Sequence, residues 1–92
     1  MKISVFVVST MEQKPIGEIT HYYGHLGVAI IKFKKEVSIG DMIHFKGPHT
    51  DFTQKIDSMQ FDHKDIKKTK NGQDVGIKVK EKVHESDKIF AV

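Results

Sequence analysis

Short runs of alternating apolar and polar residues, separated by glycine and aspartate, dominate the sequence. Residues 16–23 and 43–45 alternate apolar with polar side chains, which is the period of a strand with one buried face. Residues 28–33 form the most apolar run and predict a central strand. No window of helical length carries a sustained apolar pattern at i, i+3 and i+4. The pattern therefore predicts an all-β domain.

Three more segments, residues 3–8, 75–79 and 88–92, are also expected to be strands. Strict alternation breaks within residues 52–61, which predicts a bend or bulge there. Residues 62–71 form a polar, lysine-rich connection. Gly40 lies in a turn with Asp41 and is expected to have positive φ. Eight residues are expected to be buried: Ile19, Val28, Ile30, Ile43, Phe45, Ile56, Val75 and Ile77.

Composition narrows the classes of function. The chain has 92 residues, enough for one domain, and its lack of cysteine excludes disulfides and thiolate metal sites. All 15 basic residues are lysine, and without arginine a sequence-specific DNA interface is not expected. The lack of cysteine fits a reducing cytoplasm, and the apolar N-terminal run is too short to cross a membrane, so a cytoplasmic protein without membrane contact is expected.

Catalytic and metal sites have little support in the pattern. No glycine-rich phosphate loop is present, which argues against GTP hydrolysis, and no nucleophile motif surrounds Ser58 or Ser86. His21 and His25 flank a glycine turn rather than sharing a helix face, so no metal site is expected. We therefore expect no enzyme activity, no cofactor and no bound metal.

Five motifs occur in a familiar order: residues 16–23, 27–30, 39–41, 58–60 and 72–77. Together they resemble the second, β-barrel domain of translational GTPases of the elongation factor Tu type. The similarity is greater to the stand-alone translation elongation factor-like proteins that consist of this barrel alone. It covers about residues 15–90 of a single domain, leaving the strand and connector of residues 1–14 outside. The resemblance implies a small closed antiparallel β-barrel of about six strands.

The resemblance also implies where RNA would bind. In the full-length factors, the positions of Gln60 and Asp74 carry a glutamate and an asparagine that help to hold the end of aminoacyl-tRNA. The lysine-rich connection next to them offers charge for phosphates. Alternation places one of the two adjacent tyrosines in the core and leaves the other exposed for stacking. The candidate RNA-binding residues are Tyr22, Gln60, His63, Lys64, Lys67, Lys68, Lys70 and Asp74.

Two functions follow as hypotheses. The first is a translation elongation factor-like, non-catalytic module that binds tRNA, rRNA or a ribonucleoprotein. The alternative is a protein-interaction accessory domain, because similar barrels are appended to collagenase-like peptidases, some of whose members modify RNA. In that case the chain would serve such an enzyme in trans.

Another departure from the expected family is Ser86, which stands where a glycine is usual, so its turn must be different or strained.

Overall fold

The computed structural model describes residues 14–92, and within that range it assigns strands and no helix. The strand predicted at residues 3–8 lies outside the described residues. The strands are β1 (Gly17–Tyr23), β2 (Val28–Phe33), β3 (Met42–Gly47), β4 (Thr50–Lys55), β5 (Met59–Phe61), β6 (Lys64–Ile66), β7 (Asp74–Lys78) and β8 (Lys88–Ala91).

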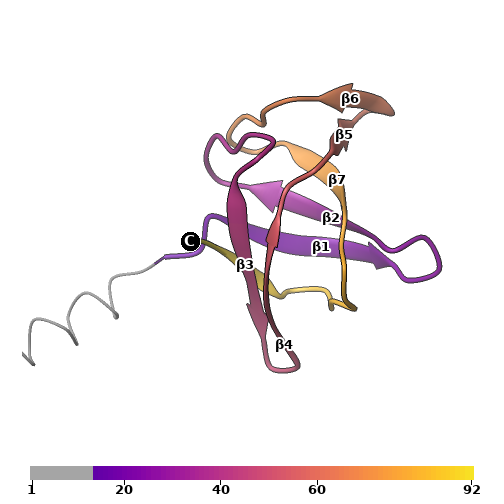
Figure 1. Ribbon diagram of the computed structural model, residues 1–92, viewed down its shortest axis with the longest axis vertical. Helices are drawn as coiled ribbons and strands as arrows, with labels where there is room; N and C mark the ends of the chain where they lie inside the picture. The colour runs from indigo at the N-terminus through magenta and orange to yellow at the C-terminus, as the bar shows by residue number, and fades with distance from the viewer. Residues whose placement is uncertain (1–13) are drawn as a thin grey trace, which may run out of the picture.

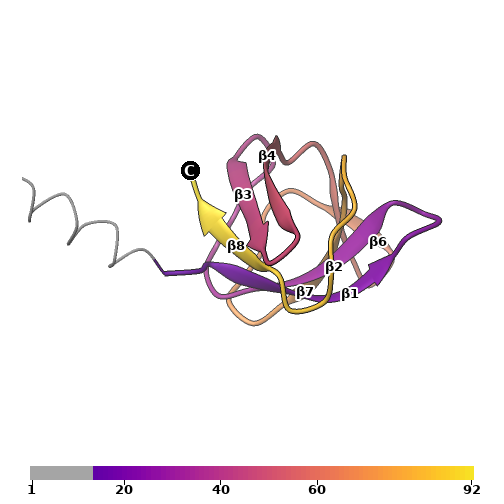
Figure 2. The same ribbon diagram turned by 90° about the horizontal axis from the view of Figure 1, so that it is seen from below.

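One antiparallel sheet contains all eight strands, in the order β4-β3-β8-β1-β2-β7-β5-β6. It curls strongly around an interior, and the β1–β2 hairpin projects beyond the other strands (Figures 1 and 2). The predicted all-β antiparallel class is confirmed. The predicted closed ring is wrong, because β4 and β6 end the sheet and no backbone pairing joins them within residues 14–92. The predicted strand number is wrong too, since residues 64–66 pair as a strand inside the expected connection.

The bend expected within residues 52–61 is confirmed between β4 and β5. β4 pairs with β3, whereas β5 pairs with β7, so the bend carries the chain from one end of the sheet towards the other (Figure 1). Ile56 lies in the bend and is fully buried. Its backbone makes two hydrogen bonds with the turn that precedes β3: Gly40 N–H donates to Ile56 O at 2.8 Å, and Ile56 N–H donates to Asp41 O at 2.9 Å. These bonds fix the bend against the turn.

A single cluster of buried apolar side chains forms the core. Six of the eight residues expected there, Ile19, Ile43, Phe45, Ile56, Val75 and Ile77, are at most 1% exposed. The aromatic rings of Phe45 and Phe52 stack with centroids 4.7 Å apart. The remaining members of the cluster come mainly from β2, the chain after it and β8: Ala29, Ile31, Phe33, Val37, Met59, Val83 and Ile89.

The prediction is wrong for β2, where Val28 and Ile30 face outwards and are half-buried. Ala29, Ile31 and Phe33 point into the core instead. An uninterrupted apolar run does not reveal which alternate set faces inwards. Lys32 could have identified the outward face of β2, because its ammonium must stay in water and it shares a face with Ile30. The outer face of β2 is consequently apolar.

The Gly40 turn forms as the sequence predicts. Gly40 has φ of 97°, and the Asp41 carboxylate accepts the Ser38 backbone N–H at 2.9 Å. An isolated bridge between Ser38 and Lys68 ties this turn to the chain between β6 and β7. The same segment is anchored by Thr69, a fully buried residue whose hydroxyl accepts the Val37 N–H at 3.0 Å and donates to Lys35 O.

Candidate functional site

Gln60, His63 and Asp74, all predicted from the sequence to share a site, lie around one depression on the outer face of the sheet. Gln60 is on β5, His63 is in the turn after it, and Asp74 begins β7. Alternation accounts for the outward direction of Gln60, since Met59 beside it is buried. The depression has a volume of about 200 Å³ and is lined by Val28, Ile30, Gln60, Asp62, His63, Asp74 and Gly76.

The β5–β6 hairpin holds two of these side chains in place. Its turn residues Asp62 and His63 have φ of 55° and 64°, the double positive φ of a two-residue type I′ turn. Such turns favour asparagine or aspartate followed by glycine, so His63 at the second position is the unusual residue. The side-chain amide of Gln60 donates to Asp65 Oδ1 at 3.1 Å across the hairpin. The turn was not predicted from the sequence, because it lacks the glycine that usually marks a two-residue hairpin loop.

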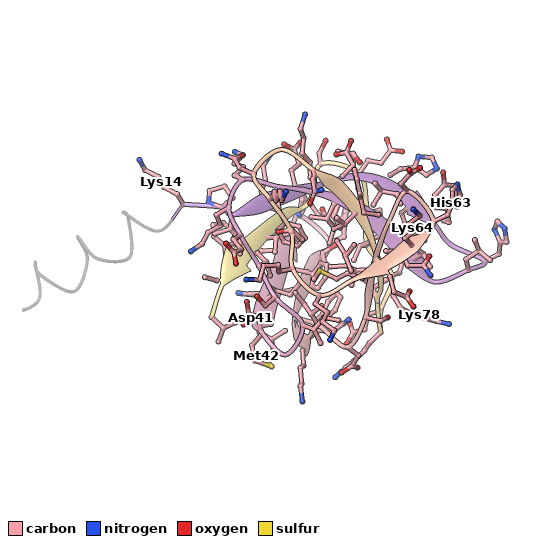
Figure 3. All side chains as sticks on the ribbon, turned by 90° about the horizontal axis from the view of Figure 1, so that it is seen from above. Lys14, Asp41, Met42, His63, Lys64 and Lys78 are labelled. Atoms are coloured by element: carbon pink, nitrogen blue, oxygen red, sulfur yellow. The ribbon has the colours of Figure 1, made fainter. Side chains whose placement is uncertain are left out.

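The four predicted lysines do not line the depression. Lys64 is on β6, exposed, and lies near His63 on the opposite side of the view from Asp41 and Met42 (Figure 3). Lys67, Lys68 and Lys70 follow on the connection to β7 and are exposed as well. The Lys68 ammonium is 3.0 Å from the Glu36 carboxylate, so part of the basic charge is neutralised within the chain.

The two adjacent tyrosines separate as alternation predicts, but the candidate residue is the inner one. Tyr22 is half-buried and packs against the core, whereas Tyr23 is 41% exposed. The His21 ring meets the Tyr23 ring edge-on, with centroids 4.3 Å apart. Tyr23 and Leu26, which is 56% exposed, therefore form the apolar tip of the projecting hairpin.

Most residues that shape the outer face were not predicted as site residues from the sequence; on β7 only Asp74 was. On β7, Asp74, Gly76 and Lys78 all face outwards, and their neighbours Val75 and Ile77 are buried. A second depression of about 190 Å³ adjoins the first and is lined by Val28, Ser58, Gln60, Gly76 and Lys78. The alternation of an acidic residue, a glycine and a basic residue along β7 was the sequence signal that could have identified this face.

A hydroxyl, an imidazole and a carboxylate also meet at Thr50, His84 and Asp87. The Thr50 hydroxyl donates directly to Asp87 Oδ2 at 2.5 Å, and the His84 ring lies 3.4 Å from that hydroxyl. A nucleophilic hydroxyl donates its hydrogen bond to a histidine base, whereas this hydroxyl donates to the carboxylate. Asp87 is buried and also accepts the His84 backbone N–H, so the group fastens a turn. A Cβ at Gly47 would overlap this carboxylate, which explains the glycine at that position.

Charge elsewhere is arranged in small exposed pairs. On the β3–β4 pair, the hydrogen bond with His44 lowers the pKa of the Asp51 carboxyl below its ordinary value, and the nearby Lys46 ammonium adds to the effect. No group of three histidine, aspartate or glutamate side chains within residues 14–92 is arranged to hold a metal ion. In the same range, no helix has the length and apolar character to cross a membrane.

No protein-family model matches the chain. Curated relatives include a protease of Methanocaldococcus jannaschii that is named as uncharacterized, 34% identical over 76 residues, which are 82% of this chain and 19% of that protein. A collagenase of Porphyromonas gingivalis is 35% identical over an alignment of 83 residues, and the match covers 88% of this chain and 23% of the collagenase. The chain thus spans about a fifth of the length of the curated relatives it matches.

Two solved structures share the whole fold. Both are crystal structures of the C-terminal domain of a Geobacillus thermoleovorans protein named as a U32 peptidase, 22% identical to this chain with TM-scores of 0.80. The superposition covers 85% of this chain and 99% of that domain in one structure, and 87% and 92% in the other. The chain has the fold of that C-terminal domain.

These relatives correct the interpretation drawn from the sequence. The expected family of translation elongation factor-like proteins is wrong, because the similar proteins are a protease, a collagenase and a U32 peptidase domain. The RNA-binding function that rested on this family loses its support with it. The individual motifs are short pieces of strand and turn, such as residues 16–23 and 39–41, and pieces of this kind do not separate the two families.

Proposed function

We propose that the chain is a non-catalytic accessory domain that binds a collagenase-like peptidase through protein–protein contacts. The observation that carries this proposal is the structural likeness to the C-terminal domain of a U32 peptidase, which extends over 99% of that domain. The curated relatives support it, because the segment similar to this chain is about a fifth of each longer protein. An accessory domain needs a docking surface and no reaction centre of its own.

The side-chain chemistry of the described residues supports the non-catalytic part of the proposal. The Thr50 hydroxyl donates its hydrogen bond to the Asp87 carboxylate rather than to His84. The other conspicuous histidines are each engaged with a carboxylate at the surface: His21 lies 3.1 Å from Glu85, and His44 lies 2.6 Å from Asp51. Such exposed pairs fasten neighbouring segments and contribute little to stability.

The docking surface we assign lies beside the two ends of the described chain. The start of the coloured ribbon and the C-terminus lie on the same side of the molecule (Figures 1 and 2), and Ile16 N–H donates to Ile89 O at 2.7 Å. In a protein that carries such a domain at its C-terminus, the preceding domain is joined where the domain begins, so it is nearest to this face. A cleft of about 250 Å³ opens here, which we call the terminal cleft; it is lined by Ile16, Lys35, Glu36, Val37, Asp41, Met42, Ile43, Ala91 and Val92.

The exposed side chains of the terminal cleft are suited to a protein partner. Met42 is 44% exposed and Val92 is 75% exposed, although both are apolar. Lys35, Glu36 and Asp41 provide a charged rim around them. An apolar centre with a polar rim is the usual anatomy of a protein–protein interface, and flexible methionine side chains adapt well to a partner.

A co-purification experiment tests this proposal. Tagged chain is added to a nuclease-treated extract of its own organism, bound proteins are identified by mass spectrometry, and the peptidase found is then purified and mixed with the chain. We expect a collagenase-like peptidase to be retained and to form a complex with the pure chain. If such a peptidase is present in the extract but is not retained, the proposal is wrong.

Two variants test the docking surface separately. Met42→Lys places a charge in the terminal cleft and should weaken peptidase binding at least tenfold. Leu26→Lys, at the tip of the projecting hairpin, is the matched control and should leave the affinity within twofold. Both side chains are exposed, so neither change should alter folding. The reverse result would move the docking surface from the terminal cleft to the hairpin.

A further inference from the structure

A shallow groove crosses the outer face of β2, β7 and β5, away from the terminal cleft. It consists of the two adjoining depressions described above, which share Val28, Gln60 and Gly76. In the register of the sheet, Gly76 lies between Ile30 on β2 and Gln60 on β5. Because Gly76 has no side chain, the middle of this row is low, and the half-buried Val28 and Ile30 form an apolar floor. We call this feature the β7 groove.

The two ends of the β7 groove carry opposite charge. Asp62 and Asp74 line one end together with His63, whereas Lys78 lines the other. Lys32 lies opposite Asp74 in the register and offsets part of its negative charge. Lys32 does not line the groove, whereas Asp62 does. On the described surface the Lys78 ammonium takes part in no ion pair within 4.0 Å, and it points away from the body of the molecule in Figure 3.

The spacing of these groups matches an extended peptide. Asp74, Gly76 and Lys78 are alternate residues of β7, so neighbouring positions on this face are about 6–7 Å apart. An extended chain laid along β7 presents its own alternate side chains at the same interval. Each depression, at about 190–200 Å³, is smaller than the roughly 300–1,000 Å³ usual for cofactor and small-molecule pockets. Such a size suits single side chains.

We propose that the β7 groove binds an extended peptide segment of a protein partner, centred on a small apolar residue over Gly76. Two positions to one side, the peptide carries a cationic residue that lies against Asp62 and Asp74. Two positions to the other side, it carries an acidic residue that lies against Lys78. The peptide binds through side chains on the face of the sheet, because β2, β7 and β5 each have paired strands on both edges.

Peptide titrations on the whole chain test this proposal. The probe is the capped pentapeptide lysine–glycine–valine–glycine–glutamate, made in this order and in the reverse order because the direction along β7 is open. The controls replace both charged residues by glutamine, or valine by glycine. Binding is followed by the amide NMR shifts of the isotope-labelled chain. We expect saturable shifts centred on Ile30, Gln60 and Gly76, with at least one probe binding five times more tightly than either control.

Filling the groove gives a second readout. An added Cβ at Gly76 meets Val28, Ile30 and Gln60 at ordinary contact distances of 3.6–3.9 Å, so Gly76→Ala should fold normally. The fold of Gly76→Val is checked by its NMR spectrum. Alanine should weaken probe binding several-fold and valine at least tenfold. Gly24→Ala, in the hairpin turn, is the control and should bind like the unaltered chain. Lys78→Glu should reverse the preference at its end and favour a peptide with lysine at both charged positions.

The proposal is overturned if probes and controls bind equally, if the shifts map elsewhere, or if Gly76→Val binds as well as the unaltered chain. It is also overturned if RNA, rather than the peptides, produces the saturable shifts while the variants keep their fold. These results are independent of peptidase docking, because the peptide experiment contains no peptidase and the altered residues do not line the terminal cleft.

Discussion

Backbone conformation at single residues is the most local level at which this sequence determines its fold. Gly40 and Ser86 both have positive φ, at 97° and 75°, yet only one of them is glycine. The glycine was predictable, because a turn between two strands that contains glycine and aspartate favours this geometry. The strain at Ser86 was predictable only by comparison with a family pattern, since serine by itself gives no sign of positive φ.

Replacing Gly40 tests the cost of a side chain in this conformation. Gly40→Val should lower the free energy of unfolding by more than about 1 kcal/mol, because a β-branched residue is strained at positive φ. An added Cβ would meet nothing within 4 Å, so the cost is conformational rather than steric. Urea unfolding of this variant beside Gly24→Ala, whose φ is not positive, measures the difference. Equal stability of the two variants would contradict this account.

Ser86 offers the opposite test. Its turn is closed by a hydrogen bond from Asp87 N–H to His84 O at 3.1 Å, and its third residue carries the positive φ that glycine accepts without strain. Ser86→Gly should therefore raise the free energy of unfolding by about 0.5–1 kcal/mol. Ser58→Gly, in an exposed segment without positive φ, should lower it slightly because glycine adds freedom to the unfolded chain. Destabilisation by both changes would show that Ser86 is not strained.

Strand positions were more predictable from the sequence than strand faces and pairings. Alternation with one charged residue fixes the buried side of β3, where Ile43 and Phe45 face inwards as expected. In β2 the apolar run hides which alternate set faces inwards, and a register shift in β1 between Ile19 and His21 changes which β1 residues lie opposite it. Strand β6 was not predicted, because its three residues are too few to show the alternation of a strand.

The bend between β4 and β5 depends on a side chain that no pattern identifies. Gln54 is 4% exposed; its amide donates to Lys78 O at 2.7 Å, and its carbonyl oxygen accepts the Lys80 N–H at 2.9 Å. A polar side chain thus joins the edge strand β4 to the chain at the end of β7, where backbone pairing is lacking. A buried glutamine is unusual, and its partners are known only once the strands are placed.

Gln54→Met keeps the size of this side chain and removes both hydrogen bonds. We expect the free energy of unfolding to fall by about 1–3 kcal/mol, because two backbone groups lose their partners in a partly buried place. Thr53→Val, on the exposed face of the same strand, should change it by less than about 0.5 kcal/mol. Chemical denaturation of the two variants decides the matter. A Gln54→Met variant as stable as the unaltered chain would mean that the bridge does not hold β4 in place.

At the scale of the whole molecule, fold class was accessible from the sequence and partner class was not. Strand-length alternation and glycine turns suffice for an all-β antiparallel domain. The same features occur in barrels attached to translation factors and to peptidases, so they could not decide between the two. Gln60, His63 and Asp74 were predicted as one site and do lie together, but Val28, Ile30, Gly76 and Lys78 define the shape and charge of that surface.

The central claim, that this domain serves a collagenase-like peptidase, is tested most directly by binding in trans. The measurement is sedimentation velocity of the pure chain mixed with a purified collagenase-like peptidase of its own organism, from which any segment similar to this chain has been removed. The account predicts a one-to-one complex that survives nuclease treatment and is weakened by Met42→Lys. Two separately sedimenting species at about 100 μM of each protein, with both correctly folded, would contradict it.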